Sequence, residues 1–230
     1  MLLKHLLVKS LSCTVFIIVL WKYCQGICRH PVISVLVPVF NSAAYLDECL
    51  QSIGNQSLPN YEVIIVDDGS TDSSLHILKK YAKQDRRIHV IRHRGNRGSM
   101  LARKTAVSHA KGRYCCFLDP DDYFPCCNAL SSMVELITTY NVDMVQFSVT
   151  AFRYQDHRED IGMNNYLKVY ETALYGNKDI LEGFFFHYKI AQTVWNKVYR
   201  TTTVILAFQN LPDQYIPVTE DLCISFVLAY

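Results

Sequence analysis

Short apolar runs that end in polar turns are the feature that most limits the folds open to this chain. The clearest runs are residues 33–37, 61–66 and 113–118. The turns that follow them are PVFN at 38–41, DDGS at 67–70 and DPDD at 119–122. Mostly apolar runs of this length are typical of parallel strands that are buried on both faces.

Segments with apolar residues at helical spacing separate these runs. We expect helices at residues 44–53, 75–81, 99–111 and 128–140, and further strands at 88–91 and 144–149. Regular alternation of strands and helices with short connections predicts an α/β fold, a Rossmann-like, mostly parallel sheet with helices on both faces. Ligands of such sheets bind beyond the carboxyl ends of the strands. The polar turns are therefore the expected site.

Composition limits the function classes. The 230 residues are 50% hydrophobic, enough for one substantial core, and the net charge of +2 gives no indication of nucleic-acid binding. The nine cysteines include no CxxC pair. A structural zinc site would need ligands at such short spacing. The cysteines, two adjacent pairs among them, are therefore interpreted as small core residues in a reducing compartment.

The two ends of the chain differ from its middle. Residues 11–21 are mostly apolar, but the run is shorter than the ~20 residues that a membrane span needs. We expect residues 1–30 to be an N-terminal apolar segment that anchors to or contacts a membrane, with a signal-like segment or an ordinary apolar extension as alternatives. A helix is expected at 178–187, and a final apolar helix follows Thr219. Because the sequence stops within that helix, residues 31–230 are expected to form a domain that is incomplete at its C-terminus.

Acidic residues are concentrated after the strand at 113–118. Asp119, Asp121 and Asp122 lie within four positions and repel one another unless a cation compensates them. Hard oxygen ligands suit Mg²⁺ or Mn²⁺, which also bind diphosphate oxygens. A solvated turn with helix-capping aspartates is the alternative.

Three other sets of polar residues carry weaker signals. Asp67 and Asp68 follow a strand and can accept hydrogen bonds from a base N–H or a ribose hydroxyl, or belong to a helix-capping turn. Arg103, with two arginines before it, suits a diphosphate or a solvated basic face. Glu220 and Asp221 offer a general base, or follow Thr219 as the start of a capped helix.

Taken in order, these segments resemble the family 2 glycosyltransferases, which have the GT-A fold. The matching segments are SVLVPVFN at 34–41, VIIVDDGSTD at 63–72, Ala102 with Arg103, GRY at 112–114, FLDPDD at 117–122, WNK at 195–197 and TED at 219–221. Each motif is weak alone, whereas the ordered set is specific.

The resemblance implies a role for each matching residue. Donor binding falls to Pro38, Phe40, Asn41, Asp67, Asp68, Arg103, Asp119 and Asp121. Within this set Asp68 accepts a hydrogen bond from the base, and Arg103 lies near the diphosphate. Asp121 or Asp122 holds the metal, Mn²⁺ or Mg²⁺. Asp221, with Glu220 beside it, is the catalytic base.

The resemblance also implies a reaction. A sugar moves from a nucleoside diphosphate sugar, a UDP-sugar by expectation, to a hydroxyl of a glycan or lipid-linked sugar acceptor, with inversion. The setting is surface polysaccharide or glycan synthesis in the cytoplasm, at the membrane if the N-terminal segment associates with it, and without nucleic acid. Two alternatives stay open: an inactive nucleotide-sugar-binding remnant and a metal-dependent nucleotidyltransferase. The lack of a glycine-rich loop after the first strand argues against a dinucleotide-binding fold.

Overall fold

The computed structural model describes residues 30–152, 159–160, 164, 174, 179–180, 193–214 and 224. From Pro31 onward the chain forms one compact unit. Residues 1–29, most of the helix predicted at 178–187 and most of the final helix lie outside the described residues. The division into segments 1–30 and 31–230 therefore stays a prediction. Among the helices that are described, none combines the length and the apolar character that crossing a bilayer requires.

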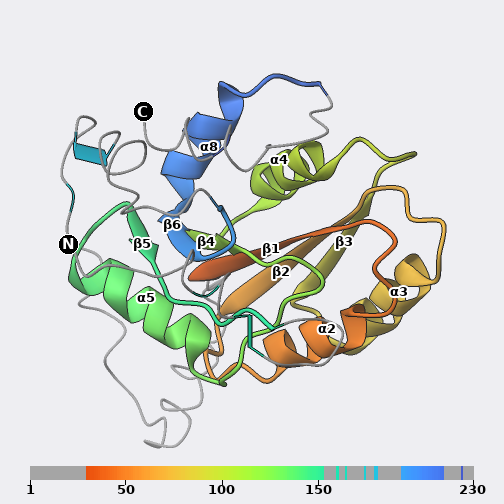
Figure 1. Cartoon of the computed structure of the whole chain (residues 1–230), viewed down its shortest axis with the longest axis horizontal. Helices are drawn as coiled ribbons and strands as arrows, with labels where there is room; N and C mark the ends of the chain where they lie inside the picture. Colours follow the sequence, from red (N-terminus) through yellow and green to blue (C-terminus); the bar gives the residue numbers. More distant parts are fainter. Residues whose placement is uncertain are drawn as a thin grey trace, which may run out of the picture. The chain divides into compact units, whose positions relative to one another are not determined.

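Six strands in the described part of the chain form one sheet (Figure 1). They are β1 (Ile33–Val39), β2 (Tyr61–Asp67), β3 (Ile88–Arg92), β4 (Tyr114–Phe117), β5 (Met144–Gln146) and β6 (Lys197–Arg200), in the spatial order β3-β2-β1-β4-β6-β5. Strands β3, β2, β1 and β4 are parallel to one another, and β6 runs antiparallel to β4 and β5. The predicted α/β fold with a mostly parallel sheet is confirmed.

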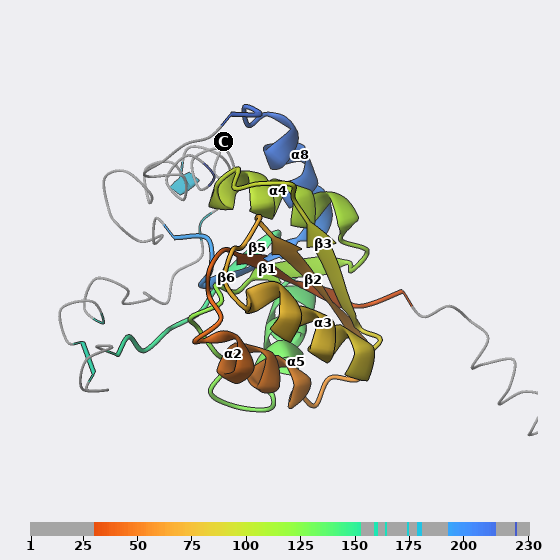
Figure 2. The ribbon, with the colours of Figure 1, turned by 90° about the vertical axis from the view of Figure 1, so that its right-hand side faces the viewer.

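Helices cover both faces of this sheet, as Figure 2 shows edge-on. On one face lie α2 (Leu46–Gly54), α3 (Ser74–Gln84) and α5 (Ala129–Thr139), and on the other lie α4 (Ser99–His109) and α8 (Thr201–Gln209). Every residue of β1, β2 and β4 is buried, because helices cover both of their faces. This burial explains the mostly apolar runs in the sequence, and the two polar residues inside them, Ser34 and Glu62, are hydrogen-bonded to each other at 2.7 Å.

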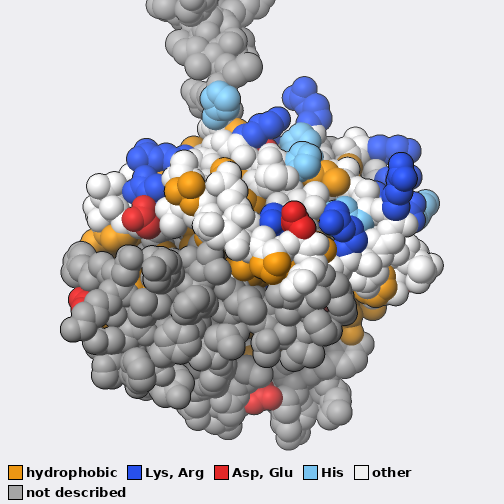
Figure 3. All heavy atoms as spheres, turned by 90° about the horizontal axis from the view of Figure 1, so that it is seen from above, with side chains coloured by type: hydrophobic (Ala, Val, Ile, Leu, Met, Phe, Trp, Pro, Cys, Tyr) orange, Lys and Arg blue, Asp and Glu red, His pale blue; other side chains and the backbone are white. Residues whose placement is uncertain are grey.

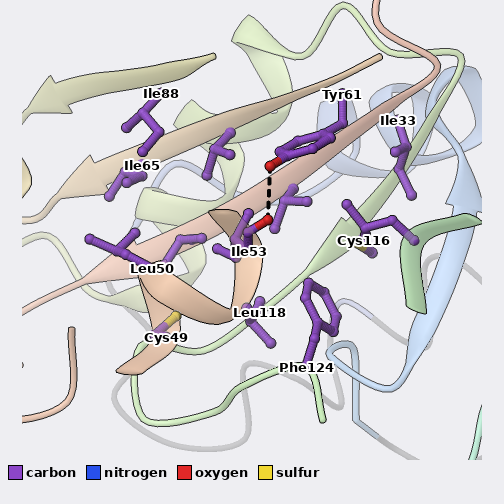
Figure 4. Close-up of a cluster of buried hydrophobic side chains, with 14 of the residues drawn as sticks. Ile33, Cys49, Leu50, Ile53, Tyr61, Ile65, Ile88, Cys116, Leu118 and Phe124 are labelled. Atoms are coloured by element: carbon purple, nitrogen blue, oxygen red, sulfur yellow. Dashed lines mark hydrogen bonds between the residues drawn. The ribbon is translucent and has the colours of Figure 1, made fainter. Parts of the chain in front are cut away.

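The core beneath α2 fixes that helix against the sheet (Figure 4). Leu50 and Ile53 of α2 are 2% exposed. Burying a side chain of this size contributes about 1.5–3 kcal/mol. The hydroxyl of Tyr61 donates to the carbonyl oxygen of Ile53 at 2.8 Å, which satisfies a carbonyl near the helix end. Together these contacts fix the C-terminal end of α2 on the sheet beside the start of β2.

Strand register brings the polar turns together. Val39 of β1 pairs with Asp67 of β2, and Leu36 of β1 pairs with Phe117 of β4. Because these strands are parallel, the residues that follow them emerge at the same edge of the sheet. The PVFN, DDGS and DPDD turns therefore become neighbours although they are far apart in sequence.

The structure differs from the predictions in three places. Strand β6 and helix α8 were not predicted, because the segment around Lys197 mixes aromatic and basic residues. Lys197 is nevertheless 1% exposed, and its ammonium donates to Asn196 Oδ1 at 2.7 Å. Of the two adjacent cysteine pairs, the second, Cys126 and Cys127, is exposed rather than part of the core; all the cysteines described are free thiols.

Candidate functional site

The turn after β1 is tied to the turn after β2. Asn41 adopts a left-handed backbone conformation, with φ of 50°. Its side-chain oxygen accepts the N–H of Thr71 at 2.8 Å, and its own N–H donates to Ser70 Oγ at 3.0 Å. Asn and Asp tolerate this conformation better than other residues with a Cβ. Asn41 thus joins the two turns, and its predicted role in donor binding stays a prediction.

Asp67 and Asp68 stand side by side but have different surroundings. Asp67 is fully buried, accepts the N–H of Ser70 at 3.1 Å and lies 3.3 Å from Arg92 Nε. Asp68 accepts the backbone N–H groups of Arg97 and Gly98, at 2.9 and 2.7 Å. Asp67 therefore shapes its own turn, whereas Asp68 holds the loop that leads into α4.

Close packing joins these two loops. Gly69 has φ of +77°, and a Cβ placed on it would lie 2.6 Å from the backbone carbon of Gly95. Only glycine adopts this conformation at little cost and leaves room for the neighbouring backbone. The DDGS turn and the loop before α4 are thus packed backbone against backbone.

Arg103 lies on α4 and reaches toward the turn after β4. Its side chain is 4% exposed, and Nη2 donates to Asp119 Oδ1 at 2.8 Å. Charge-assisted hydrogen bonds between buried partners are among the stronger polar contacts in proteins. The pair fixes one carboxylate of the DPDD turn beside a guanidinium at the edge of the sheet.

The two remaining carboxylates of this turn are less compensated. Asp121 is exposed and Asp122 is half-buried. Burial, followed by the charges of Asp119 and Asp121, raises the pKa of Asp122 to about 7. Burial, followed by the charges of these three aspartates, also raises the pKa of the adjacent Cys49 thiol. The turn therefore has an excess of negative charge that the neighbouring protein groups leave largely unbalanced.

A cavity of about 350 Å³ opens where these turns meet. It is lined by Pro38, Val39, Phe40, Ser42, Asp68, Asn96, Gly98, Ser99, Ala102, Arg103, Asp119, Pro120 and Asp121. The volume is within the range of small-molecule sites, toward its lower end. A cavity at the carboxyl ends of parallel strands is the expected position for a ligand in a sheet of this kind.

Most of the predicted site residues border this cavity. Of the predicted donor-binding set, Asn41 and Asp67 stand outside the lining, as does Asp122 of the predicted metal pair. The predicted base, Asp221, and its neighbour Glu220 lie outside the described residues. The roles assigned to all of these residues stay predictions.

Sequence reasoning missed the contribution of the loop before α4. Asn96, Gly98 and Ser99 line the cavity, and His93, which is 8% exposed, contacts Asp68 through Nδ1 at 2.6 Å. The signal that could have pointed to this loop is the pair of glycines, Gly95 and Gly98, directly before a predicted helix.

Figure 3 looks down on the face of the molecule that carries α4 and α8. On the part of this face that the structure describes, Lys and Arg side chains are scattered among uncharged ones. Nucleic-acid-binding proteins commonly present a continuous basic stripe. The described part of this face shows no such continuous stripe.

The strands and the polar turns described above lie within one segment that matches a known protein family. A family model described as Glycosyl transferase family 2 matches residues 34–212, the span that contains all three polar turns. The chain belongs to glycosyltransferase family 2. This assignment confirms the predicted resemblance.

Individual members of the family extend the comparison. The chain is 46% identical over 92 residues to the putative teichuronic acid biosynthesis glycosyltransferase TuaG of Bacillus subtilis (strain 168), an alignment that covers 40% of this chain and 36% of TuaG. The first curated relatives that it matches are longer, and the chain spans less than half of their length.

Solved structures of other glycosyltransferases show the same fold. S. aureus TarS 1-349 in complex with UDP superposes with a TM-score of 0.65 at 23% identity, over 84% of this chain and 53% of that one. Mannosyltransferase PcManGT from Pyrobaculum calidifontis, in complex with GDP-Man and Mn²⁺, gives a TM-score of 0.57 at 20% identity, over 86% of this chain and 55% of that one. The GT-A fold predicted for this family 2 chain is therefore confirmed.

Proposed function

We propose that this family 2 chain carries the donor-binding part of an inverting, metal-dependent sugar transferase that uses a UDP-sugar. The observation that carries the proposal is the cavity in which Asp68, Arg103, Asp119 and Asp121 converge from separate elements. TarS binds UDP in a structure of the same fold, which supports a uridine nucleotide as the first ligand to test.

The donor would lie across the cavity from one acidic turn to the other. Phe40, which is 43% exposed, offers an apolar surface for a base beside Asp68. Arg103 and Asp119 form a fixed pair at the opposite side, where the ribose and diphosphate would lie. A guanidinium held in this way is oriented before any ligand arrives, which lowers the entropy lost on binding.

The DPDD turn fits a divalent cation that is shared with the donor. Among the described residues, no three His, Cys, Asp or Glu side chains are arranged to hold a metal by themselves. Mg²⁺ sites in such enzymes commonly use one or two carboxylates together with phosphate oxygens. The uncompensated charge around Asp121 and Asp122 suits that arrangement. When bound, the cation supplies charge stabilisation for the departing diphosphate.

The chemical step would be a single displacement. Asp221 accepts the proton of the acceptor hydroxyl, and the resulting oxygen attacks the anomeric carbon of the sugar. The bond from that carbon to the diphosphate oxygen breaks, so the nucleoside diphosphate leaves and the configuration inverts. The acceptor is a hydroxyl of a glycan or lipid-linked sugar, and the name of TuaG makes a surface polysaccharide the first acceptor class to test.

The proposed setting is the cytoplasm, with membrane association through residues 1–30. The cysteines described are free, and burial raises the pKa of Cys115 to about 12, so that this thiol stays protonated and unreactive. Free thiols of this kind are compatible with a reducing compartment.

Calorimetric titration with UDP, with and without Mn²⁺, tests the proposal, followed by an assay of UDP-sugar hydrolysis and transfer. We expect binding that depends on Mn²⁺, and transfer with inversion detected from the anomeric proton signal of the product. Asp221→Asn should abolish transfer but leave UDP affinity near that of the wild type, and Glu220→Gln tests whether the neighbouring carboxylate shares the role of the base. Binding without turnover would identify a non-catalytic protein, and no binding of UDP or other nucleoside diphosphates would refute the proposal.

A further inference from the structure

His93 connects two walls of the cavity region without lining the cavity itself. It follows β3 at the start of the loop that leads into α4 and is 8% exposed. Nδ1 lies 2.6 Å from Asp68 Oδ1, and Nε2 lies 2.9 Å from the hydroxyl oxygen of Thr105 on α4. One imidazole thus bridges the DDGS turn and α4.

The hydrogen-bond partners of the His93 imidazole determine which of its nitrogens carries a proton. An ionised carboxylate only accepts hydrogen bonds, so the nitrogen that faces Asp68, Nδ1, must carry a proton. Nε2 then accepts from the Thr105 hydroxyl when the ring is neutral, and donates to it when the ring is charged. In both states His93 donates to Asp68, so this contact persists whichever charge the ring carries.

The hydrogen bonds of Asp68 leave little of its carboxylate free. It accepts from His93 Nδ1, from the N–H of Arg97 through both oxygens, and from the N–H of Gly98. A carboxylate offers about four acceptor positions. The four hydrogen bonds, two to each oxygen, therefore occupy all of these positions.

We propose that His93 is a positioning residue of the nucleotide pocket. It holds the Asp68 carboxylate, and through it the backbone of Arg97 and Gly98, in place as one wall of the cavity. This inference rests on the proposed donor-binding function.

The packing of the loop makes this positioning necessary. The backbone of Gly95 lies against Gly69, while Asn96 and Gly98 of the same loop line the cavity. A rotation of the Asp68 side chain would break its bonds to Arg97 and Gly98 and shift that wall. His93 restrains the rotation because its other nitrogen is fixed to Thr105 on α4.

Two replacements of His93 separate the two contacts of the ring. His93→Asn places an amide N–H near the position of Nδ1 and loses the contact with Thr105, whereas His93→Gln reaches Thr105 and loses the donor to Asp68. Thr105→Val removes the hydroxyl but keeps the shape of the side chain. Calorimetry of the full chain with UDP, in Mn²⁺, measures the affinity of all three variants.

We expect His93→Gln to weaken UDP binding about tenfold, as the loss of a charge-assisted hydrogen bond in the wall of the pocket implies. His93→Asn should restore UDP affinity to within about twofold, and Thr105→Val should lose less than His93→Gln. A His93→Gln variant that binds like the wild type, or a His93→Asn variant that is as weak as His93→Gln, would overturn the inference.

Amide hydrogen exchange at Arg97 and Gly98 tests the positioning without any ligand. We expect both amides to exchange faster in His93→Gln than in His93→Asn. If the wild type binds no nucleoside diphosphate, the proposed function fails. The role of His93 is then tested only by the amide hydrogen exchange rates of Arg97 and Gly98. Equal exchange rates in the two variants would then refute that role.

Discussion

The carboxylates of the two acidic turns that border the cavity, DDGS and DPDD, differ in the groups that compensate their charge. Around Asp68, the protein itself supplies the hydrogen-bond donors, from His93 and from the backbone of the loop before α4. Around Asp122, burial and then the charges of Asp119 and Asp121 raise the pKa to about 7. The first turn is already satisfied in the free protein. In the second, Arg103 pairs with Asp119 only, and the other two carboxylates have no such partner among the contacts described.

Because of this difference, the two turns should affect the stability of the free protein in opposite directions. A carboxylate with a full set of donors stabilises the fold and orients the pocket before a ligand binds. A cluster of like charges destabilises the free protein and is relieved when a cation binds. Changes at the first turn should therefore damage stability and binding together. Changes at the second should damage activity while stability holds or rises.

The largest effect is expected from Asp121→Asn. Loss of a carboxylate that holds the cation beside the diphosphate should lower kcat/KM for sugar transfer about 10²- to 10³-fold, by analogy with the loss of one electrostatic contact in a transition state. Asp121 is exposed, so the free energy of unfolding should change little. Steady-state kinetics across a Mn²⁺ series, beside urea denaturation, measures both. An unchanged Mn²⁺ dependence would place the cation elsewhere.

The next largest effect concerns the first turn and is one of stability. Gly69→Ala forces a side chain into a φ of +77° and against the backbone of Gly95, which should cost about 3 kcal/mol of unfolding free energy. Gly95→Ala is the matched control, because a Cβ at that position meets nothing within 4 Å. Urea denaturation of both variants should separate them clearly. Similar losses would mean that the two loops are less tightly packed than we describe.

Much of this comparison could be predicted from the sequence. Strands β1, β2 and β4 are buried on both faces, so each left a mostly apolar run, with only Ser34 and Glu62 as polar residues inside the runs, and each run ended at a polar turn. The carboxylates of Asp68, Asp119 and Asp121 were predicted at the sheet edge for that reason, and all three line the cavity.

The partners of these carboxylates could not be predicted. His93 reaches Asp68 because β3 pairs with β2 in a register that sets Arg92 beside Asp67, and a single sequence does not reveal that register. Strand β6 was missed for a different reason. The buried Lys197 reads as a surface residue until its hydrogen bond to Asn196 is seen. In both cases the decisive contact is a polar one made only after folding.

A moderate loss of stability is expected from Asp68→Asn. The amide keeps one acceptor oxygen but presents N–H groups toward backbone amides that need an acceptor, which should cost about 2 kcal/mol. Asp72→Asn is the control, since Asp72 is an exposed acceptor in the same turn. Its loss should stay below about 1 kcal/mol. If Asp68→Asn is as stable as the wild type, the first turn is not held by this carboxylate.

The smallest effect is expected from Asp122→Asn, which should raise the free energy of unfolding at neutral and higher pH rather than lower it. The pKa of Asp122 in the folded protein, about 7, is above the ordinary value of 3.8 for an aspartate, so the folded protein binds the proton more tightly than the unfolded chain. The stability that follows from this is fully present below about pH 4 and is lost as the pH rises through about 7. An asparagine does not titrate and avoids this loss.

The stability of Asp122→Asn relative to the wild type should therefore increase by about 1 to 2 kcal/mol between pH 5 and pH 8, a value reduced because the side chain is partly open to water. Denaturation at both pH values measures the change, and the other titrating groups cancel because both proteins contain them. UDP with Mn²⁺ should reverse the ranking at pH 8, because only the wild type gains the compensating cation. A stability difference that does not vary with pH would mean that the second turn carries no uncompensated charge, and the contrast between the two turns would disappear.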